Sequence, residues 1–513
     1  MIQEAELEPE IVEEASSKVE AGIVIRQDPE AGEEINAGET VIVYVSSGTK
    51  PVSYTHLDVY KRQALWGAKV GTALLKLLRR NATFFPGKFA LKVCPDFIGK
   101  IEKPKTIVAV TGTNGKTTVC NMIEDILKDN NYVFIDNKYG SNIDAGIATT
   151  LISGANFKGK SKKDLAILEV DERSSPKIYP YLTPTYLVCT NLFRDSLMRN
   201  AHTEFISEIL TKNIPKDTTL ILNGDDLIAS NIAPENKRMY FGIDRLDTDM
   251  DKCENIARDI IVCPKCNAKL EYDYVRYNHI GKAHCPKCDF KSPDIDYLVT
   301  NLDLDNKRMT LKNGNLTEEY DLISDNIINI YNILTVITVL KQLGLSREQI
   351  NESLKKQKIV DTRYSEETVE GIKVIAHLSK GMNPIACSRV FDYVRKYKGN
   401  KVVILLLDDL HEAANGSENT AWQYDTDYEF LNDGSIKQII IAGARYLDGY
   451  VRLEIAGVDK NIVVHQRDEL SAIDKIKLDD IETVFILHDL YAMELKEAVK
   501  NKVEVIIKEK KKQ

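Results

Sequence analysis

Residues 111–118 read TGTNGKTT, which sets a lysine and several hydroxyl side chains among two glycines. The apolar run 106–110 predicts a buried strand before them, and residues 117–128 predict a helix after them. In a small-residue loop between a strand and a helix, backbone N–H groups can surround an anion, and the helix dipole favours it. We therefore predict a nucleotide-phosphate site. Its residues are Thr111, Gly112, Thr113, Asn114, Gly115, Lys116, Thr117 and Thr118.

Two side chains of this loop carry most of its predicted chemistry. Lys116 is placed to reach the β- and γ-phosphates of ATP, and the Thr117 hydroxyl is placed to hold Mg²⁺. The strict Walker pattern has glycine where this chain has Val110. A lysine and Mg²⁺ neutralise phosphate charge during transfer, so the loop predicts phosphoryl-transfer chemistry. The alternative interpretation is a turn that contains Gly-Lys-Thr by chance.

Carboxylates come at the end of a second predicted strand, residues 165–170. Glu169 and Glu172 stand at its carboxyl end, where the side chains of a parallel sheet face the ligand crevice. We expect both carboxylates near the phosphates. A solvated acidic turn is the alternative.

Four of the nine cysteines form two C-P-x-C pairs separated by 18 residues. Each pair makes a tight turn that directs two thiolates at one point, and two such turns supply a closed tetrahedral zinc site. The predicted ligands are Cys263, Cys266, Cys285 and Cys288, within a zinc ribbon at about residues 258–294. A closed site leaves no position for water or substrate, so its predicted role is structural or docking. A redox dithiol pair and a chance cluster are the alternatives.

Alternating strands and helices position these groups. Residues 64–345 predict a central ATP-binding domain with a mostly parallel sheet, because strand-like runs at 186–190 and 219–222 follow those already described. Residues 346–513 predict a C-terminal doubly wound α/β domain. Its expected strands are 401–407, 438–442, 462–465 and 483–487.

The N-terminal part of the chain has a different character. Short β-type runs and turns in residues 1–50 resemble a fragment of a PASTA domain, a small α+β fold. Residues 51–63 resemble adapter-derived sequence in translated assemblies, and we interpret them as an assembly artefact at a junction. A genuine linker is the alternative.

Composition excludes several classes of function. The net charge of −9 argues against nucleic acid as the main partner. We find no apolar run of transmembrane length and no export signal, so we expect a cytoplasmic protein with zinc-bound and free thiols.

Together these motifs resemble the Mur ligase superfamily and, within it, the MurT family, from about residue 64 onward. The resemblance implies that Lys116 and Glu169 are catalytic and that Glu169 and Thr117 bind Mg²⁺. It also implies that Asn329 and Asn332, in the NIINIYN segment, lie against the base of ATP, although plain helix capping is the alternative. Arg363 would reach the phosphates when the C-terminal domain closes.

The resemblance further implies ATP-dependent amidation of the D-glutamate α-carboxylate of lipid II to D-isoglutamine through an acyl phosphate. Ammonia would come from a GatD-type glutamine amidotransferase, a partner chain whose histidine is oriented by Asp409 or Asp425 of this chain. The implied cofactors are ATP, Mg²⁺ and structural Zn²⁺. The implied location is the inner face of the membrane, with peripheral contact through lipid II.

Three positions depart from the superfamily pattern: Ser196, Met198 and Asn326. The first two stand where amino-acid-adding relatives have metal-site residues, which puts a second metal site in doubt. Two other functions remain open from the sequence. One is another Mur or folylpolyglutamate-type amide ligase, and the other is a non-catalytic ATP- and zinc-binding scaffold.

Overall fold

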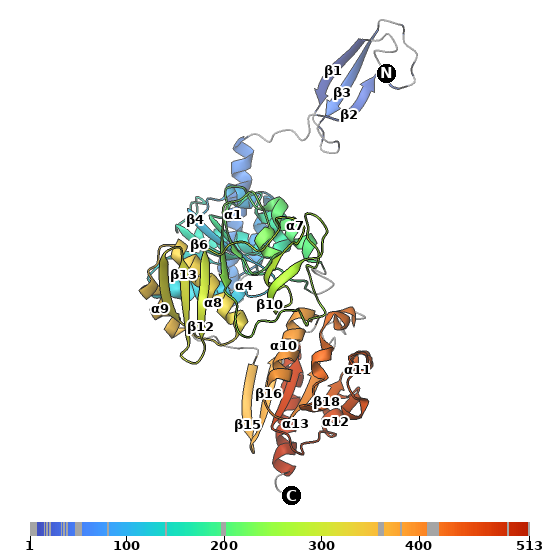
Figure 1. Ribbon diagram of the computed structural model, residues 1–513. Helices are drawn as coiled ribbons and strands as arrows, with labels where there is room; N and C mark the ends of the chain where they lie inside the picture. Colours follow the sequence, from blue (N-terminus) through green and yellow to red (C-terminus); the bar gives the residue numbers. More distant parts are fainter. Residues whose placement is uncertain are drawn as a thin grey trace.

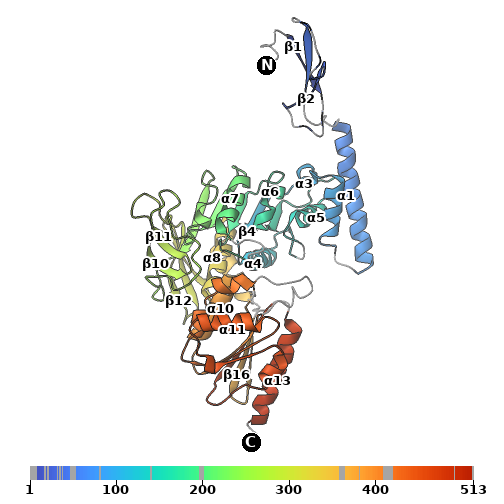
Figure 2. The same cartoon turned by 90° about the vertical axis from the view of Figure 1, so that its right-hand side faces the viewer.

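The computed structural model contains three successive parts and four β-sheets (Figures 1 and 2). It describes residues 8–510 except 15, 17–18, 20–21, 32, 34–35, 37–38, 47–53, 80–81, 139–140, 196–201, 358–363, 380–381, 408–419 and 490–491. The first part is a three-stranded sheet in the order β1-β3-β2. Its strands are β1 (Glu8–Glu14), β2 (Val24–Asp28) and β3 (Thr40–Ser46).

A nine-stranded sheet forms the middle domain, in the order β14-β13-β12-β9-β8-β7-β4-β6-β5. The pairs from β5 to β12 are parallel, whereas β12, β13 and β14 pair antiparallel. The strands are β4 (Thr106–Thr111), β5 (Phe134–Asp136), β6 (Leu165–Glu169), β7 (Tyr186–Cys189), β8 (Thr219–Asn223), β9 (Arg238–Ile243), β12 (Tyr297–Asp303), β13 (Arg308–Asn313) and β14 (Leu316–Asp321). The predicted mostly parallel α/β sheet is confirmed, and the antiparallel extension is an addition.

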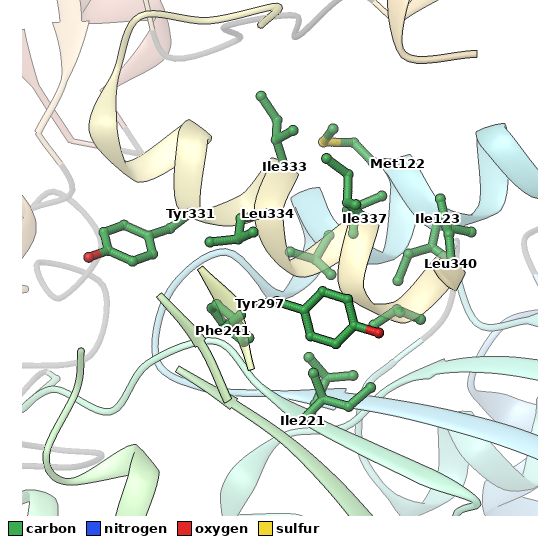
Figure 3. Close-up of a cluster of buried hydrophobic side chains, with 14 of the residues drawn as sticks. Met122, Ile123, Ile221, Phe241, Tyr297, Tyr331, Ile333, Leu334, Ile337 and Leu340 are labelled. Atoms are coloured by element: carbon green, nitrogen blue, oxygen red, sulfur yellow. The ribbon is translucent and has the colours of Figure 1, made fainter. Parts of the chain in front are cut away.

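Helices cover both faces of this sheet. Val108 and Val110 of β4 pack into one core, whereas Ile107 and Ala109 pack into the other, as the two-residue period of a strand requires. The first core lies under α4 (Lys116–Asp129), α8 (Ile327–Gln342) and α9 (Arg347–Lys356). Figure 3 shows α4 and α8 packed together over the strands. The second core lies under α1 (Tyr54–Leu77), α2 (Phe85–Val93), α3 (Phe97–Lys100), α5 (Asp144–Gly154), α6 (Ser175–Ile178) and α7 (Thr203–Asn213).

The carboxyl group of Glu124 is buried beside the first core, 3.8 Å from the amino groups of Lys128 and Lys138. Glu124 of α4 is 1% exposed, and burial together with Asp136 raises the pKa of its carboxyl from 4.5 to about 7. The folded state therefore binds a proton that the unfolded state has lost between these two pH values. Stability is then expected to fall as pH rises from about 4.5 to 7.

We predict that Glu124→Gln, which cannot ionise, raises the free energy of unfolding at pH 8 by about 2 kcal/mol and changes it little at pH 4. Urea unfolding at the two pH values measures this difference. Asp125→Asn, at the neighbouring half-buried position, is the control, because it removes a carboxylate that lies near the same Lys138 without being fully buried. Equal effects of Glu124→Gln at both pH values would contradict the prediction.

A two-stranded hairpin projects from the middle domain between β9 and β12. It consists of β10 (Glu271–Tyr277) and β11 (Ile280–His284), which pair antiparallel. The cysteine pairs flank this hairpin, one before β10 and one after β11. Its own small core contains Cys263, Cys285, Leu270 and Phe290.

The C-terminal domain has a six-stranded sheet in the order β15-β16-β20-β17-β18-β19. All pairs but β15–β16 are parallel. The strands are β15 (Tyr364–Val369), β16 (Ile372–Leu378), β17 (Lys401–Leu406), β18 (Ile436–Ala442), β19 (Val463–Gln466) and β20 (Thr483–His488). One face packs on α10 (Pro384–Lys396) and α11 (Tyr446–Ile455), and the other on α12 (Glu469–Ile473) and α13 (Met493–Lys510).

Two predicted boundaries differ from the structure. The C-terminal domain was expected from residue 346, but α9 packs on β14 and α4, with Ile350 and Leu354 in the core of the middle domain. The boundary therefore falls after Lys356. At the other end, α1 begins at Tyr54, inside the segment that we interpret as a junction, and continues to Leu77. Among the described helices, none combines the length and the apolar character needed to cross a bilayer.

Candidate nucleotide site and cysteine centre

The predicted phosphate loop connects β4 to α4 at the carboxyl edge of the central sheet. β4 lies between β6 and β7, so the chain leaves it in one direction to build β5 and β6 and in the other to build β7 to β9. Ligands bind at such switch points in open α/β sheets. Gly112 (φ 124°) and Gly115 (φ 89°) have left-handed backbones that other residues rarely adopt. A Cβ on Gly112 would also meet the Thr190 hydroxyl at 2.3 Å, so the loop tolerates no side chain there.

Lys116, at the start of α4, folds back over this loop. Its Nζ donates to the Gly112 carbonyl and lies 2.9 Å from Glu172 Oε1, and the same carboxylate oxygen accepts a hydrogen bond from the Gly112 N–H at 3.0 Å. Burial disfavours the charged lysine, but Glu172 more than compensates and raises the pKa of Lys116 above its usual value. The lysine is thus held as a cation within the loop, and Glu172 lies beside it as the sequence predicts.

The hydroxyl of Thr117, the residue after Lys116, lies against the carboxylate of Glu169. The Thr117 hydroxyl donates to Glu169 Oε2 at 2.8 Å, and Asn142 donates to Glu169 Oε1 at 3.1 Å. Both predicted Mg²⁺ ligands therefore lie together, from α4 and from the end of β6. Oxygen donors of this kind are the ones that Mg²⁺ prefers, so the pair fits that ion.

The ends of β7 and β8 support the loop from its other side. The Thr190 hydroxyl donates to the Asn114 carbonyl at 2.6 Å, and the Asn191 side chain both accepts from the Asn114 N–H and donates to its carbonyl, each at 3.0 Å. Asn223 donates to the Thr190 carbonyl at 3.2 Å. Thr190, Asn191 and Asn223 thus fix the loop conformation, a role that the motif pattern alone does not specify.

The asparagines at the start of α8 have separate roles. Asn326 caps the helix by accepting from the Ile328 N–H at 2.9 Å, which is the capping interpretation weighed above. Asn329 donates to Ser324 at 3.2 Å. Asn332 is buried beside Gly115. A Cβ added to that glycine would lie only 2.3 Å from the Asn332 Oδ1, so this asparagine lies directly against the phosphate loop.

The four predicted zinc ligands converge. Cys263 Sγ lies 3.5 Å from Cys288 Sγ, Cys266 Sγ lies 3.4 Å from Cys285 Sγ, and all four sulfurs are within 4.8 Å of one another. Distances of this size suit a tetrahedral Zn²⁺ with bonds of about 2.3 Å. His284 instead contacts Asp273 at 3.0 Å, and His279 lies in the domain core, so the cluster consists of cysteines alone among the described residues.

His279 and Arg276 anchor the ribbon on the nucleotide-binding domain. His279 Nε2 lies 3.1 Å from Asp226 Oδ1; burial opposes its charge, but Asp226 raises its pKa above the usual value. Asp226 also accepts from the Leu192 N–H at 2.7 Å, next to the segment that supports the phosphate loop. Arg276 pairs with Asp225 at 3.2 Å. The metal centre and the nucleotide site thus belong to one connected structure.

Residues 254–259 of the middle domain make non-covalent contacts with the C-terminal domain. Asp427 accepts from the Asn255 side chain at 2.8 Å and from the Ile256 N–H at 2.6 Å, and Asn255 also accepts from the Asn278 N–H, in the hairpin turn, at 2.9 Å. Arg194 bridges Asp259 at 2.5 Å and Asp425 at 3.1 Å.

The ion pair with Arg194 gives Asp425 a partner within the chain itself, whereas we predicted that Asp425 could serve a partner subunit. Four other predicted positions, Ser196, Met198, Arg363 and Asp409, lie outside the described residues.

The sheet order, the loop at its switch point and the two-domain arrangement define a ligase of the Mur type. The pattern described as Mur ligase middle domain matches residues 110–259. Among solved structures, a pseudomurein peptide ligase type C from Methanothermus fervidus superposes with a TM-score of 0.57 at 20% identity over 81% of each chain. MurF from Acinetobacter baumannii gives 0.53 at 15% identity over 81% of this chain and 80% of that one. These likenesses establish the fold.

Sequence comparison assigns the chain to one family among the Mur-type ligases. The pattern described as MurT ligase C-terminal matches residues 378–493, and that of the PASTA domain matches residues 1–47. The lipid II isoglutaminyl synthase (glutamine-hydrolyzing) subunit MurT of Staphylococcus aureus strain COL is 32% identical over 402 residues, which cover 78% of this chain and 89% of that one. The Streptococcus pneumoniae subunit is 29% identical over 82% of this chain and 92% of that one. This chain belongs to the MurT family.

Proposed function

We propose that this chain is the ATP-using subunit of an enzyme that amidates the α-carboxylate of D-glutamate in lipid II, giving D-isoglutamine. Membership of the MurT family supports the proposal, because the relatives that carry this name are subunits of a glutamine-hydrolyzing lipid II isoglutaminyl synthase. The observation that carries it is the site geometry. A largely buried lysine, a glycine-rich loop, and a threonine–glutamate pair lie together at one edge of the sheet.

The proposed reaction has two steps. A carboxylate oxygen of the substrate attacks the γ-phosphorus of ATP, the bond to the bridging oxygen of ADP breaks, and an acyl phosphate forms. Ammonia then attacks the acyl carbon; the new C–N bond forms, phosphate leaves with the bonding pair, and the nitrogen loses a proton. Conversion to an acyl phosphate supplies the leaving group that amide formation requires.

The residues of this chain act mainly by holding charge. Lys116 and the loop N–H groups would bind the β- and γ-phosphates, and Asn329 and Asn332 would lie along the nucleotide. Thr117 and Glu169 would hold Mg²⁺, which neutralises the charge of the transferring phosphate. Arg363 would complete the phosphate site from the C-terminal domain. The ribbon would hold Zn²⁺ in a structural role.

Ammonia is proposed to come from a GatD-type glutamine amidotransferase partner. The relatives are named as subunits of a synthase, which implies a partner chain. We propose Asp409 as the residue that orients the partner's catalytic histidine, since Asp425 is held by Arg194. The substrate is a lipid, so we place the reaction at the cytoplasmic face of the membrane.

The test is amidation of lipid II followed by mass spectrometry. The full chain would receive lipid II and ATP-Mg²⁺, with either a GatD-type partner and glutamine or ammonium alone. We expect a product about 1 Da lighter, formed with equimolar ADP, since –OH is replaced by –NH₂. ATP turnover with another carboxylate and none with lipid II would indicate a different amide ligase. The complete absence of ATP turnover would favour a scaffold.

We predict that Glu169→Gln lowers ATP turnover by about 100-fold and raises the Mg²⁺ concentration needed for half-maximal rate, because one anionic ligand is lost. A Mg²⁺ titration of ADP release measures both effects. Glu102→Gln, a surface change outside the site, is the control and should titrate like the unaltered protein. An unchanged Mg²⁺ dependence in Glu169→Gln would place the metal elsewhere.

A further inference from the structure

One face of α1 is apolar and open to solvent. Trp66, Val70, Leu74 and Leu77 are all more than half exposed and recur every three or four residues, so they form one stripe along the helix. The opposite side of the same helix is buried through Ala64, Leu65 and Ala68. Figure 2 shows α1 along the outer side of the middle domain, with α3 and α5 on its inner side.

A loop between α5 and β6 extends this stripe. The Trp66 Nε1 donates to the Phe157 carbonyl at 2.9 Å, and the centroid of the exposed Phe157 ring lies 5.5 Å from the amino group of Lys69 on the same helix. At the start of α2, Phe85 is also exposed, and a Cβ on Gly71 of α1 would lie 3.6 Å from its ring. Three separate segments thus bring apolar and aromatic side chains to one surface. We call Trp66, Val70, Leu74, Leu77, Phe85 and Phe157 the α1 face.

From Val59 onward, the charged residues of α1 and α2 are all basic. Residues 59–93 contain eight Lys or Arg and no Asp or Glu, although the whole chain has a net charge of −9. The loop that carries Phe157 adds further lysines. They are Lys158, Lys160, Lys162 and Lys163. Such a concentration of positive charge on an acidic protein is a specific feature of this surface.

The combination identifies a class of partner. Trp, Phe and Leu side chains beside Lys and Arg are the composition of a surface that lies in the interface of an anionic bilayer, with the apolar groups among the acyl chains and the cations at the headgroups. A second copy of this chain would have to dock through an acidic, apolar surface such as the exposed stripe on α11, an alternative that the sedimentation measurement below tests. α11 carries a similar exposed stripe, Leu447, Val451 and Ile455, but next to Asp448 and Glu454, and so lacks the positive charge that anionic lipid attracts.

We propose that the α1 face docks this chain on the surface of an anionic membrane. The docking goes beyond the proposed reaction and does not depend on lipid II or ATP. It would hold the enzyme in the plane of the bilayer, where a membrane-bound substrate diffuses.

The experiment is flotation of the full chain with vesicles of phosphatidylglycerol and phosphatidylcholine, and with vesicles of phosphatidylcholine alone, in the absence of lipid II and ATP. We expect binding to the anionic vesicles only, and its weakening at high salt. Leu74→Glu/Leu77→Glu is expected to weaken binding by at least about tenfold, since two anchoring side chains become anionic. The matched control is Leu447→Glu/Ile455→Glu on α11, which should bind like the unaltered chain.

Tryptophan fluorescence gives a second readout. The chain has two tryptophans, Trp66 at 53% exposure and Trp422 at 1%. Insertion of the α1 face should shift the Trp66 emission to shorter wavelength and make it accessible to brominated lipids, and Trp66→Phe should remove this change. Circular dichroism would verify that each variant is folded.

Three outcomes of the vesicle experiment would overturn the proposal. They are failure of the folded chain to bind anionic vesicles, equal binding to neutral vesicles, and unchanged binding by Leu74→Glu/Leu77→Glu. A dimer in sedimentation that this double variant abolishes, without vesicle binding, would also overturn it and assign the face to a second copy. Because the vesicles contain no substrate, failure here is distinct from failure of the amidation assay.

Discussion

Lys116→Met is expected to reduce ATP-dependent amidation, and ADP release with it, by about 100- to 1,000-fold. The reason is electrostatic: the lysine cation would offset charge that develops on the transferring phosphate, and methionine fills a similar volume without charge. Parallel measurement of ADP and of amidated product tests the expectation. Lys128→Met, at the exposed end of the same helix, removes a lysine outside the site and should leave both rates unchanged.

The same substitution has a separate effect on stability. Glu172 would lose its partner while remaining buried, and breaking a buried pair in this way costs about 3–5 kcal/mol. Lys116→Met/Glu172→Gln removes both charges and should recover much of that loss without recovering activity. Urea unfolding and ADP release of the two variants separate the effects. Recovery of activity in the double variant would mean that Lys116 serves only to hold the loop together.

Removal of the ribbon metal is the other large expected effect. The purified chain should contain about one zinc per chain, and Cys263→Ser should lose it, because a closed site needs all four thiolates. Structural zinc sites bind with apparent free energies of about 10–16 kcal/mol in small peptides, so we expect the loss to unfold the ribbon. The hairpin is also held by Arg276 and His279, so the remaining middle domain should stay folded, with a lower melting temperature.

Cys253→Ser is the matched control, because it makes the same change at a partly buried cysteine outside the cluster. It should retain zinc and stability. Metal analysis, thermal melts with and without chelator, and limited proteolysis of residues 258–294 would report the result. A metal-free chain whose melting temperature is indifferent to chelator would support a redox dithiol pair instead.

Local features of this molecule could be predicted from its sequence, and long-range ones could not. Many of the buried parallel strands are continuous apolar runs, so β4, β6, β7, β8 and four of the six C-terminal strands, β17 to β20, were located to within a residue or two. The strands β15 and β16 were not predicted. The phosphate loop and the cysteine pairs are short motifs, and the spacing of residues within each motif is enough to predict its local geometry. By contrast, β13 and β14 are partly exposed, with many polar residues, and have no such apolar signal.

Contacts between distant segments account for the remaining differences. The role of Asp425 depends on Arg194, which is more than 200 residues away in the chain, and no local pattern reports that ion pair. The pairing of Lys116 with Glu172 has the same origin, although the strand-end position of Glu172 predicts that it lies nearby. The capping box at Ser346 marks the start of helix α9 in the sequence. Only the packing of the helix into the first core shows that it belongs to the middle domain.

The hydrogen bonds of Asn255 have a mechanical consequence. Its side chain donates a hydrogen bond to Asp427 of the C-terminal domain and accepts one from the Asn278 N–H of the ribbon hairpin. Asn255 therefore connects the C-terminal domain to the ribbon. Rotation of the C-terminal domain would pull on the chain that enters the first cysteine turn. Conversely, loss of order in the ribbon would remove this restraint on the C-terminal domain. The zinc centre would thus restrain how the C-terminal domain sits against the middle domain.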